Sequence, residues 1–108
     1  MDKKQRIATL NDQLRRHHVG GKALITAGIQ ALGVEVVTDI LAAIAAFADF
    51  TPDNDPYGEH DCAVMTVAEH RVIWKIDYYD RDMAYASPDP ADADLTIRVM
   101  TIMLADEW

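Results

Sequence analysis

The sequence predicts an α+β fold, in which a short antiparallel sheet (a hairpin plus one or two further strands) packs against two or three helices. Three segments repeat apolar residues at helical spacing, and two neighbouring segments alternate apolar and polar residues as hairpin strands do. The 108 residues contain no internal repeat, low-complexity tract or linker. We therefore predict a single domain over residues 1–108.

A first helix is predicted from Lys3 to His18. Its apolar residues form one stripe at helical spacing, namely Ile7, Leu10 and Leu14. Gly20-Gly21 is predicted to end this helix, because glycine adopts the left-handed cap conformation at little cost. A short strand is then expected at residues 22–26.

A second helix is predicted from Val34 to Phe50. Its buried face is expected to contain the larger apolar residues, Val36, Val37, Ile40, Leu41, Ile44 and Phe47. Thr51-Pro52 is expected to end it, since a residue that precedes proline avoids the helical region. The segment from Asp53 to Gly58 is rich in residues that favour turns.

A hairpin is predicted from strands at residues 61–67 and 71–79. With a turn at Glu69-His70, the register places Ala63 opposite Ile76, Met65 opposite Trp74 and Val67 opposite Val72. These six apolar residues then share one face of the sheet. The other face is mixed and contains Cys62, Val64, Thr66, Ile73, Lys75, Asp77 and Tyr79.

The C-terminal part is predicted to hold a third antiparallel strand at residues 83–86, a turn at Ser87-Pro88-Asp89-Pro90, and a final helix from about Asp92 to Asp106. Asp92 is a good N-terminal cap for such a helix. Apolar residues surround most of its circumference, which predicts the most buried helix of the domain: Leu95, Ile97, Val99, Met100, Ile102, Met103 and Leu104.

Charge is distributed unevenly along the chain, whose net charge is −8. Residues 1–22 carry six Lys/Arg against two Asp, and the remaining residues carry four Lys/Arg against sixteen Asp/Glu. A body this acidic repels phosphates, which argues against direct nucleic-acid binding. No apolar run reaches the roughly 20 residues of a membrane helix, and one cysteine cannot form an internal disulfide, so we expect a cytoplasmic protein without membrane contact.

Acidic residues are expected to gather at one end of the sheet. The predicted register brings Asp61 beside Tyr78 and Glu59 beside Asp80, so the loop before the hairpin and the loop after it meet there. The carboxylates at this end are Asp53, Asp55, Glu59, Asp61, Asp77, Asp80 and Asp82, and Tyr57 and Tyr79 accompany them.

Several chemistries fit this acidic end. Carboxylates spaced along a surface can occupy the cationic groove of a nucleic-acid-binding protein, with tyrosines as anchors. Oxygen ligands also suit a divalent metal. The segment that begins at Asp53 resembles the start of a calcium-binding loop, but Val64 occupies the position where such a loop has its final glutamate. His60 with Asp61 or Asp77 can in principle transfer protons, but no nucleophile motif accompanies them. Many of these carboxylates can also simply cap turns.

Four segments carry a resemblance to a known family: FTPDNDPYGEHD at residues 50–61, WKIDYYD at 74–80, SPDPAD at 87–92 and TIMLA at 101–105. Together they resemble a family of short bacterial proteins known only as a domain of unknown function and often found on plasmids and other mobile elements. The resemblance brings no established activity and no catalytic residues to carry over to this sequence. Its genomic setting suggests a counter-defence role of the anti-CRISPR or anti-restriction type.

We therefore predict a non-enzymatic protein-binding module that recognises a nucleic-acid-handling complex through the acidic end of the sheet. The predicted contact residues are Asp53, Asp55, Tyr57, Glu59, Asp61, Asp77, Tyr79, Asp80 and Asp82. The alternative is a small enzyme or binding domain that depends on a divalent metal held by the acidic loops. No cofactor is expected for the protein-binding module.

Overall fold

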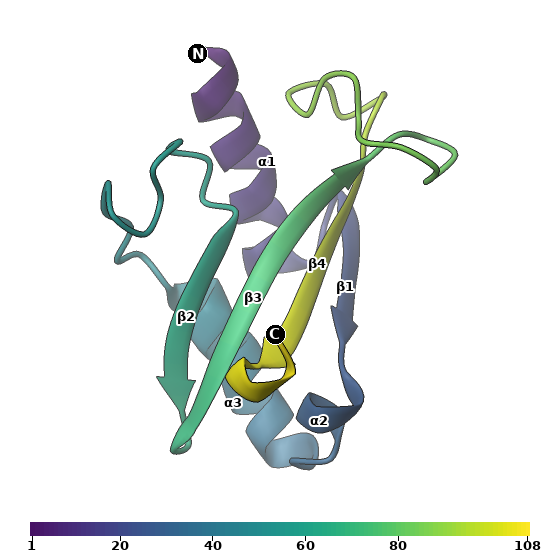
Figure 1. Cartoon of the computed structure of the whole chain (residues 1–108). Coiled ribbons are helices and arrows are strands. Elements are labelled where there is room, and N and C mark those ends of the chain that lie inside the picture. The colour runs from purple at the N-terminus through teal and green to yellow at the C-terminus, as the bar shows by residue number, and fades with distance from the viewer.

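A computed structural model describes residues 1–108 and contains a four-stranded mixed sheet with helices on one face (Figure 1). The strand order is β1 (Gly21–Ile25), β4 (Ile97–Leu104), β3 (His70–Tyr79) and β2 (Cys62–Val67). β1 runs parallel to β4, and the other neighbours are antiparallel. The predicted α+β class is confirmed, with one parallel pair that was not foreseen.

Three helices lie behind the sheet in Figure 1: α1 (Lys3–His17), the short α2 (Ala27–Gln30) and α3 (Val34–Ala46). The opposite face of the sheet, which we call the open face, carries no α-helix. A single 3-10 turn, η1 (Ala105–Glu107), follows β4 on that side. None of the helices combines the length and the apolar character that crossing a membrane requires.

Local side-chain bonds determine where α1 begins. Asp2 accepts from the Gln5 amide at 2.8 Å, and the Gln5 side chain accepts from the Asp2 amide at 3.1 Å. This reciprocal cap satisfies two amides that the first helical turn leaves free.

The end of α1 differs from the prediction. His18, with φ 55°, provides the left-handed cap instead of Gly20-Gly21. Gly21 does not cap the helix but lies against the backbone of β4, where a Cβ would be 2.6 Å from the Arg98 carbonyl oxygen. Glycine is therefore required for the close approach of β1 to β4.

α3 ends four residues earlier than predicted, at Ala46. The buried guanidinium of Arg15 in α1 explains this end. Its Nη1 donates to the carbonyls of Ile44 at 2.9 Å and Phe47 at 2.7 Å. A cation at a helix C-terminus satisfies carbonyls that lack intrahelical partners and complements the helix dipole.

The hairpin of β2 and β3 has the predicted faces but not the predicted register. Its turn is Ala68-Glu69, both with positive φ, as a two-residue type I′ turn requires. Ala63 therefore pairs with Trp74, and Met65 with Val72. The partners slip by two residues, which leaves every side chain on its predicted face.

The predicted C-terminal helix is wrong: residues 97–104 form β4, in the centre of the sheet. Both faces of β4 are covered, with Met100 and Ile102 on the helix side and Val99 and Met103 buried on the open side. A strand buried on both faces loses the alternation of polar and apolar residues, so its pattern resembles that of a buried helix. The predicted strand at 83–86 is reduced to one bridge between Tyr79 and Ala86.

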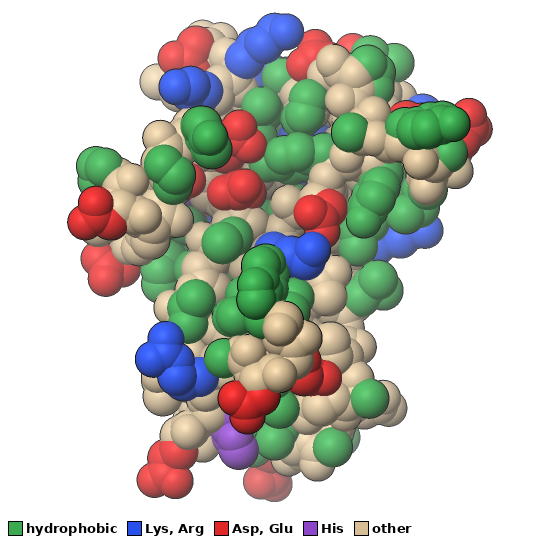
Figure 2. All heavy atoms as spheres, viewed as in Figure 1, with side chains coloured by type: hydrophobic (Ala, Val, Ile, Leu, Met, Phe, Trp, Pro, Cys, Tyr) green, Lys and Arg blue, Asp and Glu red, His purple; other side chains and the backbone are tan.

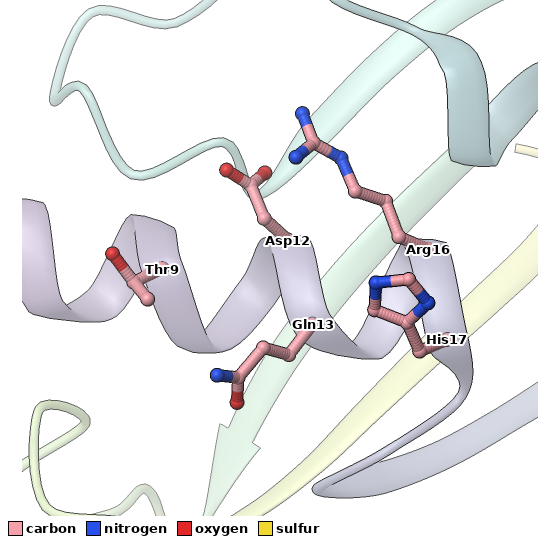
Figure 3. Close-up of a pocket in the computed structure, with 5 residues that line it drawn as sticks. All are labelled: Thr9, Asp12, Gln13, Arg16 and His17. Atoms are coloured by element: carbon pink, nitrogen blue, oxygen red, sulfur yellow. The ribbon is translucent and has the colours of Figure 1, made fainter.

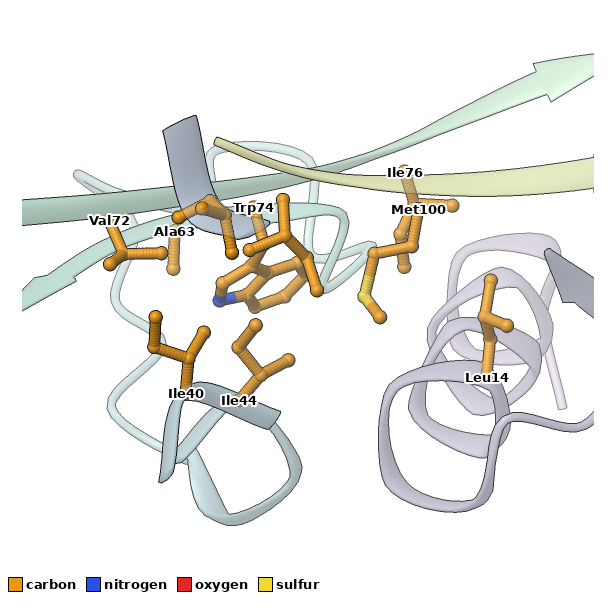
Figure 4. Close-up of a cluster of buried hydrophobic side chains, with 10 residues drawn as sticks. Leu14, Ile40, Ile44, Ala63, Val72, Trp74, Ile76 and Met100 are labelled. Atoms are coloured by element: carbon orange, nitrogen blue, oxygen red, sulfur yellow. The ribbon is translucent and has the colours of Figure 1, made fainter. Parts of the chain in front are cut away.

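The hydrophobic core lies between the helices and the inner face of the sheet (Figure 4). Trp74 of β3 is fully buried at its centre, between Ile40 and Ile44 of α3 on one side and Met100 of β4 on the other. Leu14 contributes the apolar stripe of α1. The predicted inner faces of α1, α3 and the hairpin are thus confirmed.

Candidate protein-interaction surface

The two acidic loops stand at the same end of the sheet, as predicted (Figure 1). The first loop, residues 47–61, enters β2, and the second, residues 80–96, leaves β3. The strand pairing inside this end differs from the prediction. The Asp61 carbonyl accepts from the Ile76 amide at 2.7 Å, so Asp61 is opposite Ile76 and not Tyr78.

Asp55 and Asp80 hold their own loops. The buried Asp55 carboxylate accepts from the amides of Glu59 at 3.1 Å and His60 at 3.2 Å, which fixes the turn before β2. Asp80 accepts from the Ala84 amide at 3.0 Å. Both residues therefore act mainly as turn caps.

Glu59, Asp61 and Asp77 lie closer together. Glu59 accepts a hydrogen bond from the Tyr78 hydroxyl at 2.9 Å, and Asp77 pairs with Lys75 at 3.0 Å. Burial raises the pKa of the Asp61 carboxyl, and the negative charges of Glu59, Asp55 and Asp77 add to that rise. Negative charge is therefore concentrated where β2 begins.

Three predicted contact residues remain free for a partner. Asp53 and Asp82 are exposed at the loop tips, and the Tyr57 side chain is 66% exposed. Tyr79 is half-buried beside Ala86 at the end of β3. The predicted contact residues thus fall into two groups: some stabilise the loops through hydrogen bonds, and others are exposed on the loops, where a partner can reach them.

A buried polar network anchors the first loop, and the sequence analysis missed it. Asn11 of α1 is fully buried and donates to the Glu59 carbonyl at 3.0 Å and to the Tyr78 hydroxyl at 2.8 Å. Its Oδ1 accepts from Arg98 Nε at 3.0 Å, and Arg98 also donates to the Pro90 carbonyl. Burial raises the pKa of the Tyr78 hydroxyl and lowers the pKa of Arg98. The network joins α1, β3, β4 and both loops.

His60 is part of the same anchor. Its Nδ1 lies 3.1 Å from a carboxylate oxygen of Asp12, and its ring stacks on Phe50 with centroids 4.0 Å apart. Asp12 also pairs with Arg15 at 2.8 Å. His60 therefore pairs with Asp12, and its Nε2 lies 3.8 Å from a carboxylate oxygen of Asp55. Neither Asp61 nor Asp77 is its partner, contrary to what the proton-transfer alternative supposed. Asn11 and Asp12 are adjacent in α1, and Arg15 lies one turn later. Their polarity inside an amphipathic helix was the signal available in the sequence.

An apolar groove of about 250 Å³ lies on the open face over β2 and β3, lined by Cys62, Val64, Ile73 and Trp108. Trp108 is 75% exposed, and Lys75 Nζ lies 5.7 Å from the centroid of its ring. Burial raises the pKa of the Cys62 thiol, so this cysteine is a weak nucleophile. Figure 2 shows hydrophobic side chains over the centre of this face and acidic side chains on the loops that flank it.

Two further hollows adjoin α1. One hollow, of about 430 Å³, lies between α1 and the first loop and is bordered by Lys4, Phe50, Tyr57 and His60. The other, of about 270 Å³, runs along the solvent side of α1 (Figure 3) and is lined by Thr9, Asp12, Gln13, Arg16 and His17. All five side chains of the second hollow come from one helix, which makes it an open surface groove.

No group of three or more His, Cys, Asp or Glu side chains is positioned to hold a metal ion. The carboxylates that the metal alternative required are separated by their roles: Asp55 bonds backbone amides, Asp77 pairs with Lys75, and Asp53 stands at a loop tip. Nothing in the geometry favours that alternative.

Comparison with known protein families gives one result. Residues 25–107 match the model of the family described as "Protein of unknown function (DUF3768)". The chain belongs to this family. The DUF3768 match starts at the end of β1, so α1 and its half of the polar network lie outside the matched residues. Searches of curated proteins and of solved structures gave no match.

Proposed function

We propose that this protein is a non-enzymatic binding module for a basic protein partner, with the open face and its acidic loops as the contact surface. The observation that carries the proposal is a sheet face without helices that combines an apolar groove with a mostly acidic border. Protein interfaces commonly have this anatomy, in which an apolar centre with an aromatic anchor is surrounded by a polar rim.

Charge favours a cationic partner. The protein carries a net −8, and the loop-tip carboxylates of Asp53 and Asp82 have no intramolecular hydrogen bond or ion pair to satisfy them. Proteins that handle nucleic acids present Lys- and Arg-lined grooves, which attract such a surface. We propose a nucleic-acid-handling complex as the target, in a counter-defence role of the anti-CRISPR or anti-restriction type.

The test uses exposed residues only, because replacing Asp55, Glu59 or Asp80 would disturb the loops. Asp53→Asn combined with Asp82→Asn removes two charges from the loop tips. The matched control is Glu35→Gln with Asp39→Asn, which removes two exposed charges from α3, behind the sheet. Binding to a panel of purified CRISPR effectors and restriction enzymes is measured by biolayer interferometry at low and high salt.

We expect nanomolar to micromolar binding to one member of the panel, weakened by salt, and a loss of about tenfold in association rate for the loop-tip variant alone. Trp108→Ala is expected to raise the dissociation rate, because it removes the aromatic anchor. Equal losses in the loop-tip variant and the α3 control would refute the proposed surface. Absence of binding across the panel would refute the proposed target class.

A further inference from the structure

β1 is an edge strand with unusual exposure. All five of its residues are exposed, although they point alternately to both faces of the sheet. Leu24 is 52% exposed, Ile25 is 38% exposed, and the preceding Val19 is 57% exposed. Natural edge strands are commonly protected by charges, prolines or bulges, and β1 carries only Lys22 as protection.

The hydrogen-bond pattern shows which backbone groups are free. The Thr26 amide donates to the Ile102 carbonyl at 3.1 Å, so even-numbered residues of this segment bond to β4. The amides and carbonyls of Gly21, Ala23 and Ile25 therefore point away from β4, and no loop backbone group bonds to them.

We propose that β1 is the docking edge for a second copy of this chain, paired antiparallel about a twofold axis at Ala23. In this register Gly21 faces Ile25 of the second copy, and each free amide and carbonyl finds a partner. Glycine leaves room for the isoleucine side chain. Lys22 faces Leu24 of the second copy, so no like charges stand opposite each other.

The charge distribution permits a second copy at this edge, although the whole chain is acidic. Residues 19–25 carry one charge, Lys22, in a protein whose net charge is −8. Both acidic loops stand at the end of the sheet where β1 begins (Figure 1). Antiparallel pairing turns the second copy by half a turn, so the two acidic ends lie at opposite ends of the joined sheet. The strong mutual repulsion of the acidic loops is thereby kept at a distance.

The joined sheet has eight strands, twice the four of one chain, and both open faces lie on the same side of it. This inference does not rest on the proposed function. A dimer of this kind would, in addition, present two contact surfaces side by side.

The test is sedimentation velocity over a range of concentrations, with three variants. Leu24→Lys places a cation opposite Lys22 of the second copy, and Leu24→Glu places an anion there. Val64→Lys is the matched control, because Val64 is 48% exposed on the open face of the other edge strand, β2. Thermal unfolding verifies that each variant is folded, which is expected because all three substitutions are at exposed positions.

We expect a dimer for the wild type and for Val64→Lys. Leu24→Lys should raise the dimer dissociation constant by about tenfold or more, and Leu24→Glu by much less, because its carboxylate faces a lysine. Amide exchange at Ala23 and Ile25 should slow as the dimer forms. A wild type that stays monomeric at all concentrations overturns the proposal, as does a Val64→Lys variant that dissociates as readily as Leu24→Lys.

Discussion

Replacement of Asn11 by alanine tests whether the buried polar network stabilises the domain. The substitution removes two neutral hydrogen bonds, to the Glu59 carbonyl and the Tyr78 hydroxyl, and one charged bond from Arg98. At about 1 kcal/mol for each neutral bond and about 2 kcal/mol for the charged one, the loss is about 4 kcal/mol. Arg98 is 1% exposed, so water does not readily replace the lost acceptor.

The assay is urea denaturation followed by tryptophan fluorescence, with Gln13→Ala on the solvent side of α1 as the control. A loss of about 4 kcal/mol is a large part of the 5–15 kcal/mol typical of such domains and lowers the melting temperature by about 15–25 °C. The control should stay within about 0.5 kcal/mol of the wild type. A loss below about 1 kcal/mol for Asn11→Ala would show that the network contributes little to stability.

Three further predictions concern buried or half-buried groups. Asp61→Asn should be more stable than the wild type at pH 7. The pKa of Asp61 is raised in the folded state, so folding favours the protonated carboxyl. The stability of the wild type therefore falls as pH rises from the unfolded-state pKa through the folded-state pKa, and asparagine avoids this loss. The advantage should vanish below about pH 4 in pH-dependent unfolding, and a constant difference would contradict it. Arg15→Met should lower the free energy of unfolding in urea by about 3 kcal/mol, because it removes the cation beside Asp12 and leaves two buried carbonyls without a donor. Amide exchange at the end of α3 should become faster, and unchanged exchange there would refute this role of Arg15. Cys62 should react with iodoacetamide more slowly than a free cysteine at pH 7, because burial raises its pKa; equal rates would refute that environment.

Local patterns in the sequence predicted the elements whose two faces differ. α1, α3 and the hairpin each have one apolar and one mixed face, and those faces were assigned correctly. β4 could not be assigned in this way, because neighbours cover both of its faces and both edges. The hairpin turn was misplaced by one residue because Ala68-Glu69 has no glycine or asparagine to mark its positive φ angles.

The candidate surface was predicted in outline only. The order of the hairpin strands was enough to bring the two loops to one end of the sheet. The distinction between structural and exposed carboxylates was not predictable, since it depends on contacts between residues far apart in sequence. Asn11 and Arg98, for example, are 87 residues apart and meet only in the folded domain.

The position of β4 has a consequence for the order of folding. β4 follows the other three strands in the sequence but lies between β1 and β3, so the four-stranded sheet cannot form until residues 97–104 are available. Contacts this distant in sequence slow folding. During synthesis, β1 has no strand to pair with, and the edge of β3 that faces β4 stays unpaired, until residues 97–104 arrive. Chaperones that shield unpaired strands and apolar surface should therefore bind the incomplete chain.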